Sequence, residues 1–238
     1  MNLAWEVLAH GVYRCRLPFL DVTVGLVAGQ REALLIDCGT TLSEARGIAE
    51  DVDELTGSQV SRMVLTHHHF DHILGGGAFA QAEMYAAPPV AAALTDRIPD
   101  LCAEAVSYGA DPAEVDRAAA AVHIPDHLVW HADIDLGGRV VHVQHPGRGH
   151  TDHDLVVVVP PADPGAPTVV FCGDLVEESA DPAVGPDSHL AAWPAALDRL
   201  LDLGGEDAIY VPGHGAVVDA EFVRAQRDWL ARRAVAAR

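Results

Sequence analysis

Four histidines and one aspartate stand within six consecutive residues, 67–72, in the order His-His-His-Phe-Asp-His. In an extended chain, successive side chains point to opposite faces, so His67, His69 and Asp71 share one side, and the two imidazoles can close on a single cation. Neutral imidazole is the most common metal ligand, and polar groups packed together without a metal would each need another partner. His72 follows where the chain turns and can serve a neighbouring cation. The run therefore predicts a metal site.

Three short motifs further along the chain add donors of the same kind: residues 149–151 (Gly-His-Thr), 173–174 (Gly-Asp) and 212–215 (Pro-Gly-His-Gly). Residues 66–72, Thr-His-His-His-Phe-Asp-His, match the HxHxDH signature of the metallo-β-lactamase superfamily. The three later motifs resemble this family's third histidine, bridging aspartate and last histidine, in the same order. HxHxDH alone is moderately specific, but four motifs in order, each at the end of a predicted strand, are a strong resemblance, which covers residues 22–215.

The resemblance implies the α/β class and a four-layer αββα sandwich of the metallo-β-lactamase type, with the metals at one edge of two sheets. Its ligands carry over residue by residue: one site of His67, His69 and His150, a second of Asp71, His72 and His214, and Asp174 as the bridge. Nitrogen and oxygen donors without a thiolate suit two divalent ions, and zinc is the ion we expect. Iron or manganese is compatible with the same donors.

Two such ions favour a bridging hydroxide, because a metal-bound water can have its pKa lowered to about 7. The hydroxide would attack an electrophilic carbonyl while the second ion holds the developing oxyanion. Asp71 is the candidate catalytic residue as well as a ligand. We therefore expect a dinuclear metallo-hydrolase acting on a small-molecule ester, thioester, lactone or amide.

Two alternatives stay open within the same family. The spacing of the ligands is similar to that of secreted β-lactamases with three-histidine sites, although the lysine that some of them use for the drug carboxylate is absent. Persulfide dioxygenases resemble the chain too, with a single iron held by residues corresponding to His67, His150 and Asp174. Glyoxalase II is disfavoured because only 24 residues follow His214, enough for one helix over residues 216–238.

Four side chains near these motifs have a structural and a functional interpretation. His68 is expected to pack or to form a hydrogen bond behind the site. His153 is either a surface residue or an imidazole that supports the site or faces the substrate. Asp37 is either a turn-forming residue or a carboxylate that supports a ligand, and Trp193 belongs to the core or to a pocket wall.

The charge of the chain excludes some classes of partner. It carries 35 acidic against 15 basic side chains, all of them arginine, which gives a formal net charge of -20. Nucleic-acid binding needs a basic face, and an anionic membrane surface repels an acidic protein, so we expect neither partner. Half of the residues are apolar, which argues against a disordered chain.

The apolar pattern places these motifs on alternating strands and helices. Strands are predicted at residues 5–8, 12–17, 22–28, 33–37, 60–66, 129–136, 140–144, 155–159, 168–172 and 208–211. Helices are predicted from Thr41 or Ser43 to Leu55, across the alanine-rich residues 88–122, from Ser188 to Leu203, and after Asp219. Within residues 88–122, Asp111 and Glu114 predict a helix start at Pro112. This order of strands and helices requires helices that pack on the outer faces of sheets, which gives at least three layers.

The chain is expected to form a single domain over residues 1–238, since one domain often reaches about 250 residues. No signal peptide, membrane span or CxxC pair is recognisable, and four scattered cysteines suggest reduced thiols. We therefore expect a cytoplasmic protein whose partner is a small-molecule substrate. The oligomeric state stays open.

Overall fold

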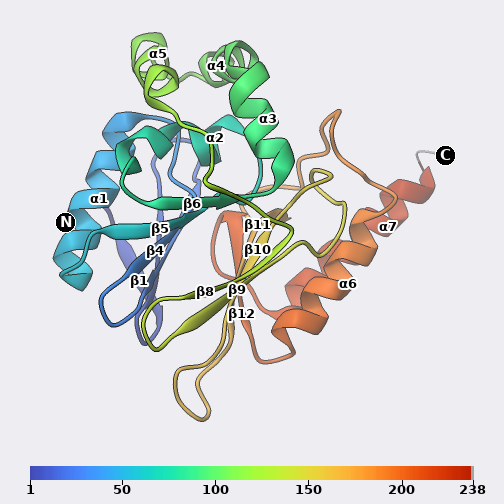
Figure 1. Ribbon diagram of the computed structural model, residues 1–238. Coiled ribbons are helices and arrows are strands. Elements are labelled where there is room, and N and C mark those ends of the chain that lie inside the picture. Colours follow the sequence, from blue (N-terminus) through green and yellow to red (C-terminus); the bar gives the residue numbers. More distant parts are fainter. Residues whose placement is uncertain (237–238) are drawn as a thin grey trace.

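The structure, a computed structural model, describes residues 1–236. Its first β-sheet has seven strands that neighbour one another in chain order (Figure 1). They are β1 (Trp5–Ala9), β2 (Val12–Arg16), β3 (Thr23–Ala28), β4 (Ala33–Ile36), β5 (Val60–Val64), β6 (Glu83–Ala86) and β7 (His127–Leu128). Strands β1 to β4 pair antiparallel and β4 to β7 pair parallel, so β4, β5 and β6 end at the same edge of the sheet.

The second sheet has five strands in the order β12-β11-β10-β9-β8. They are β8 (His131–Asp135), β9 (Val140–Gln144), β10 (Val156–Val159), β11 (Val169–Glu177) and β12 (Ile209–His214). Only β11 and β12 pair parallel. Both run toward the edge at which β5 of the first sheet ends, because an isolated bridge joins His214 to Val22 and Leu155 N donates to Thr66 O at 2.8 Å.

Helices cover the outer face of each sheet (Figure 1). The first sheet is covered by α1 (Leu42–Thr56), α2 (Phe70–Ile73), a 3₁₀ helix (Leu74–Phe79), α3 (Pro88–Asp96), α4 (Ile98–Ser107) and α5 (Pro112–Ala121). The second is covered by α6 (Trp193–Gly204) and α7 (Ala220–Ala236). The expected four-layer αββα sandwich is therefore confirmed.

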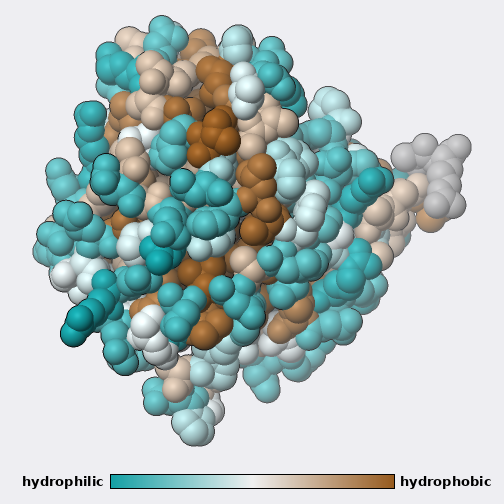
Figure 2. Space-filling model, viewed as in Figure 1, coloured by the Kyte–Doolittle hydropathy of each residue, from teal (hydrophilic) through white to brown (hydrophobic). Residues whose placement is uncertain are grey.

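The apolar core lies in three layers, as this architecture requires. The central one fills the space between the sheets with β-branched and aromatic side chains from both, such as Val27, Ile36, Val157 and Phe171. A Cβ atom built on Gly25 of β3 would lie 2.4 Å from the Phe171 ring of β11, so the sheets approach closely there. Hydrophilic side chains cover most of the face in Figure 2, with apolar side chains exposed in separate patches.

Several elements differ from the sequence prediction. The strand predicted at residues 129–136 is β8, which spans only His131–Asp135, and the prediction missed β7, the two-residue strand that ends the first sheet at Leu128. The alanine-rich residues 88–122 form three helices, because Arg97 separates α3 from α4; the predicted helix start at Pro112 after Asp111 is confirmed by α5. The sequence prediction missed β6, which is only four residues long.

Two further elements shift their bounds. Helix α6 begins at Trp193, not Ser188, and β11 continues beyond the predicted residue 172 to Glu177. Helix α7 follows Asp219, whose carboxylate accepts from Phe222 N at 2.9 Å, and residues 237 and 238 of the predicted terminal helix lie outside the described residues. Within residues 1–236, every helix falls short of the length and apolar character that a membrane span requires.

Candidate metal centre

The seven predicted ligands converge where the two sheets meet, although they come from four segments. After β5 the chain bends at residues 67 and 68, is extended at His69, and then enters α2 at Phe70. This turn carries Asp71 away from the side that His67 and His69 share, so simple alternation along an extended strand was wrong for Asp71. His150 comes from the loop between β9 and β10, Asp174 lies within β11, and His214 ends β12.

Four of these side chains form a first group, whose donor atoms all lie within 4.8 Å of one another: His67, His69, His150 and Asp174. His69 Nδ1 lies 3.1 Å from His67 Nε2 and 2.9 Å from His150 Nε2. Asp174 Oδ2 lies 3.7 Å from His67 Nε2 and 3.5 Å from His150 Nε2. Three imidazole nitrogens and one carboxylate oxygen therefore surround a common point.

The second group consists of Asp71, His72 and His214, whose donor atoms also lie within 4.8 Å of one another. Its two Nε2 atoms are 3.4 Å apart, and Asp71 Oδ2 lies 3.8 Å from His72 Nε2 and 3.5 Å from His214 Nε2. Asp174 also contacts this group, because its Oδ1 is 3.1 Å from His72 and its Oδ2 is 3.3 Å from His214. Asp174 thus lies between the two groups, the position expected of a bridge.

Each of the five imidazoles uses its other nitrogen outside the cluster. Backbone oxygens accept from two of them: Leu20 O lies 2.8 Å from His214 Nδ1, and Ala183 O lies 3.3 Å from His150 Nδ1. Asp187 Oδ2 lies 2.9 Å from His69 Nε2. In the neutral form of such a ring, the outer nitrogen carries the proton and the inner one presents a lone pair to the cluster.

Asp37 fixes the remaining two rings. Its Oδ1 accepts from Thr66 N at 2.8 Å, and its Oδ2 accepts from both Thr66 Oγ1 and His72 Nδ1, each at 2.8 Å. Because the Thr66 hydroxyl gives its only proton to Asp37, it must accept from His67 Nδ1, 3.0 Å away. Asp37 also has a φ of 60°, so it is a turn residue and a carboxylate that supports two ligands.

This donor set fits metal ions. Five inner nitrogens and the carboxylates of Asp71 and Asp174 face one another, and Asp174 Oδ1 is buried without a hydrogen bond. A cluster of acceptors needs positive charge. Burial holds the pKa of His67 well below its ordinary value, whereas for His214 the effect of burial is outweighed by Asp174, which raises its pKa to about 9. The carboxylates therefore draw a cation to this position.

Asp187 is a supporting residue that the sequence analysis missed, because no motif distinguishes it from other loop aspartates. Burial alone would raise its pKa, but the hydrogen bond from His69 holds that pKa well below its ordinary value. The neighbouring Ser188 donates from Oγ to His150 O at 2.9 Å. The loop before α6 therefore holds two of the ligand residues.

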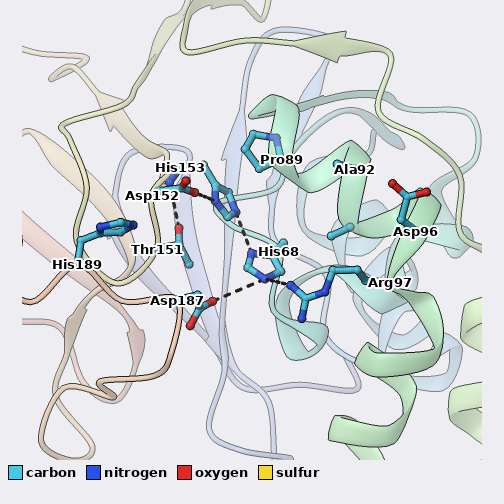
Figure 3. Close-up of a pocket in the computed structure, with 11 residues that line it drawn as sticks. His68, Pro89, Ala92, Asp96, Arg97, Thr151, Asp152, His153, Asp187 and His189 are labelled. Carbon is cyan, nitrogen blue, oxygen red and sulfur yellow. Dashed lines mark hydrogen bonds and ion pairs between the residues drawn. The ribbon is translucent and has the colours of Figure 1, made fainter.

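His68 lies outside both groups of ligands, as expected, and forms a hydrogen bond behind them. Its Nδ1 is 3.0 Å from Nε2 of His153, which is only 2% exposed, so the surface interpretation of His153 was wrong. The pair borders a second pocket, of about 320 Å³, which Asp187 also lines (Figure 3). Arg97 lines that pocket, with Nη1 3.4 Å from His68 Nε2.

Trp193 is a core residue that packs behind the cluster. It is fully buried, its ring centroid lies 5.7 Å from that of His150, and its Nε1 donates to Leu175 O at 3.0 Å. A Cβ on Gly149 would lie 3.0 Å from the same indole ring, so glycine allows the His150 loop to pack against α6.

A pocket of about 340 Å³ opens over the cluster. Five of the seven ligands border it, namely His69, Asp71, His150, Asp174 and His214. Its outer wall comes from Leu20, from α4 and the residue after it, and from residues 183–187. A small molecule in this pocket would therefore contact both groups of ligands.

Comparisons with known proteins agree with this geometry. The family model of the metallo-beta-lactamase superfamily matches residues 17–214. A metallo-beta-lactamase type 2 of Bacillus sp. (strain 170) is 24% identical over 209 residues, which cover 87% of this chain and 72% of the relative. A protein of the same name from Bacillus cereus is 27% identical over 100 residues, 41% of this chain and 37% of the relative.

Solved structures show the same fold. The crystal structure of VMB-1 superimposes with a TM-score of 0.73 at 20% identity and covers 98% of both chains. The metallo-beta-lactamase FIM-1 from Pseudomonas aeruginosa, solved in a mono-zinc form, gives a TM-score of 0.73 at 18% identity, with 98% of this chain and 96% of that chain covered. With the family model matched over most of its length, the chain belongs to the metallo-beta-lactamase superfamily.

Proposed function

We propose that this protein is a dinuclear metal-dependent hydrolase, with zinc as the metal, that acts on a small-molecule ester, thioester, lactone or amide. Membership of the superfamily implies a hydrolase. The observation that carries the proposal is the convergence of five imidazole nitrogens with the carboxylates of Asp71 and Asp174. Asp174 Oδ1 is buried and has no hydrogen bond within residues 1–236. Such a donor set has a clear use only with cations bound to it.

His67, His69 and His150 would hold one ion, and Asp71, His72 and His214 the other, with Asp174 shared. When bound, the two ions would acidify a water and polarise the substrate carbonyl. The chain itself orients this centre, because each imidazole is fixed by its outer hydrogen bond. Asp71 borders the pocket, and its Oδ1, the oxygen that would not bind the ion, can accept a proton beside the reacting atoms, which is its proposed catalytic role.

A second candidate is β-lactam hydrolysis, which the comparisons favour because both Bacillus relatives are named metallo-beta-lactamases. A third is a dioxygenase with a single iron held by His67, His150 and Asp174, which the first group would accommodate. The metal content and the reaction distinguish these candidates. Two zinc ions per chain support hydrolysis, whereas one iron with thiol-dependent oxygen uptake supports the dioxygenase.

The test combines metal analysis of the purified protein with a panel of lactone, thioester and β-lactam substrates. His150→Ala should lose metal and at least about 100-fold in kcat/KM, because removing a ligand disables the centre. His142→Ala is the matched control, since this imidazole is exposed on β9 and pairs with Asp133. Less than one metal per chain, or equal inactivity on every substrate, would refute the proposal.

A further inference from the structure

Among residues 1–236, no arginine lines the pocket over the metal cluster, and the chain has no lysine. Besides the ligands, three carboxylates line it: Glu104, Glu177 and Asp187. Glu177 is buried and accepts from Ala183 N at 3.0 Å, and Asp187 accepts from His69. Glu104 of α4 is therefore the carboxylate available to a ligand.

Glu104 is exposed and forms no ion pair within residues 1–236. The arginines on its own helix boundary and on the next helix pair with other carboxylates: Arg97 with Asp100, and Arg117 with Glu114. Arg97 lines the second pocket (Figure 3), and it is absent from the lining of the pocket over the cluster. Among the described residues, no arginine therefore lies in the pocket wall to pair with Glu104.

Two aromatic rings lie beside Glu104 in the same pocket. Tyr108 directly follows α4 and is 61% exposed, and its ring centroid lies 5.7 Å from that of Phe70. Phe70 stands next to Asp71, so this pair connects the pocket rim to the ligands. An accessible aromatic face next to an unneutralised carboxylate is the arrangement that binds an organic cation, through cation–π attraction and charge.

We propose that the substrate carries a cationic ammonium group, which Glu104 and Tyr108 bind at the rim while the scissile carbonyl faces the metal cluster. This proposal rests on the proposed hydrolase function and narrows its substrate class. It also separates the protein from enzymes that select an anionic substrate, because that selection needs a cationic side chain in the pocket. Glu104 and Tyr108 are then specificity-determining residues.

A pair of substrates that differ only in charge tests the proposal. Acetylthiocholine and 3,3-dimethylbutyl thioacetate have nearly the same shape, with a quaternary nitrogen or a carbon atom at the same position. In both, water adds to the carbonyl carbon and the C–S bond breaks to give acetic acid and a thiol. We expect wild type to prefer the cationic thioester by about tenfold in kcat/KM, from an ion pair and a cation–π contact.

Glu104→Gln should reduce this preference about fivefold and Tyr108→Leu about threefold, because each variant removes one of the two contacts. Glu221→Gln makes the same change of charge on the exposed face of α7, outside the pocket, and should keep the wild-type preference. An equal preference in wild type and Glu104→Gln would overturn the proposal.

Binding provides a readout that does not depend on turnover. Choline and 3,3-dimethylbutanol, titrated into the purified holoprotein by ligand-observed NMR, should show tighter binding of choline to wild type and a loss of that difference in Glu104→Gln. If neither thioester is hydrolysed but choline still binds more tightly through Glu104, the hydrolase function fails and the cation site stands. If both alcohols bind equally to wild type, the cation site is refuted whatever the enzyme hydrolyses.

Discussion

The ligand residues are recognisable from sequence because they are confined to short motifs, but the groups that orient them are not. His214 and His150 donate to backbone oxygens of Leu20 and Ala183, and any residue can supply a backbone oxygen. Leu20 adopts a left-handed φ of 57°, which is rare for leucine and which no pattern predicts. The ligand set could therefore be predicted, whereas most of its supporting contacts required the fold.

Asp187 provides a direct test of such support. Asp187→Ala removes the acceptor of His69 Nε2, so the ring is free to rotate and its Nδ1 no longer faces the cluster. We expect metal affinity at the first group to fall about 10- to 100-fold, the usual effect of losing a hydrogen-bond partner of a ligand. Competition with a chromophoric chelator measures this affinity.

The control for this experiment is Asp152→Ala, which removes another aspartate bonded to an imidazole, at 2.8 Å from His153 Nδ1. His153 lies outside both ligand groups, so metal affinity should stay within about twofold of wild type. Equal losses in the two variants would mean that general loosening of the loops, not the orientation of His69, controls metal binding.

Asp37 has a larger structural role, because one buried carboxylate accepts three hydrogen bonds. Asp37→Ala leaves Thr66 N, Thr66 Oγ1 and His72 Nδ1 without their acceptor, and we expect the free energy of unfolding to fall by about 2–4 kcal/mol. Urea denaturation checks this value. Asp133→Ala, which removes an exposed carboxylate paired with His142, should cost less than about 1 kcal/mol, and a similar loss in both would contradict the assigned role.

At the scale of elements, prediction succeeded where the apolar pattern and the local capping residues agree. The pairs β1–β2 and β3–β4 fall within a residue or two of the predicted bounds, since short polar turns separate their apolar runs. The prediction failed where pairing with a distant strand determines whether a segment is a strand and which sheet it joins. A strand was predicted at residues 129–136, where β8 pairs with β9, but β7 at His127–Leu128 was missed because its two residues form a strand only by pairing with β6. Only the fold determines that the chain passes from the first sheet to the second between Leu128 and His131.

The start of α1 shows how the structure resolves an ambiguity left by the sequence. Thr41 and Ser43 both precede the helix, and the structure places the capping box on Thr41, with Glu44 N donating to Thr41 Oγ1 at 3.2 Å. Thr41→Ala should therefore lower the free energy of unfolding by about 1 kcal/mol. Ser43→Ala, an exposed position inside the helix, should change it by less than about 0.5 kcal/mol. Thermal denaturation of the two variants checks the order, and a reversed order would place the cap on Ser43.

At the scale of the molecule, the metal groups exist because two sheets meet: His67, His69, Asp71 and His72 follow the first sheet, and the other ligands belong to the second. The contact between the sheets must therefore be fixed to within a fraction of an ångström for the donors to share a point. A single domain over residues 1–238 stays a prediction. The tight approach of Gly25 to Phe171 is one contact that sets the distance between the sheets.

Gly25→Ala tests that contact. The new methyl group would lie 2.4 Å from Phe171 Cε1, so the sheets must move apart, and we expect a loss of about 1–3 kcal/mol in the free energy of unfolding together with weaker metal binding. Gly47→Ala is the matched control, since its methyl group meets nothing closer than 3.5 Å within α1 and should stabilise the protein by about 0.5–1 kcal/mol. Phe171→Leu should recover part of the loss in the Gly25→Ala background, and strictly additive effects in this double-mutant cycle would show that the two residues do not set the spacing.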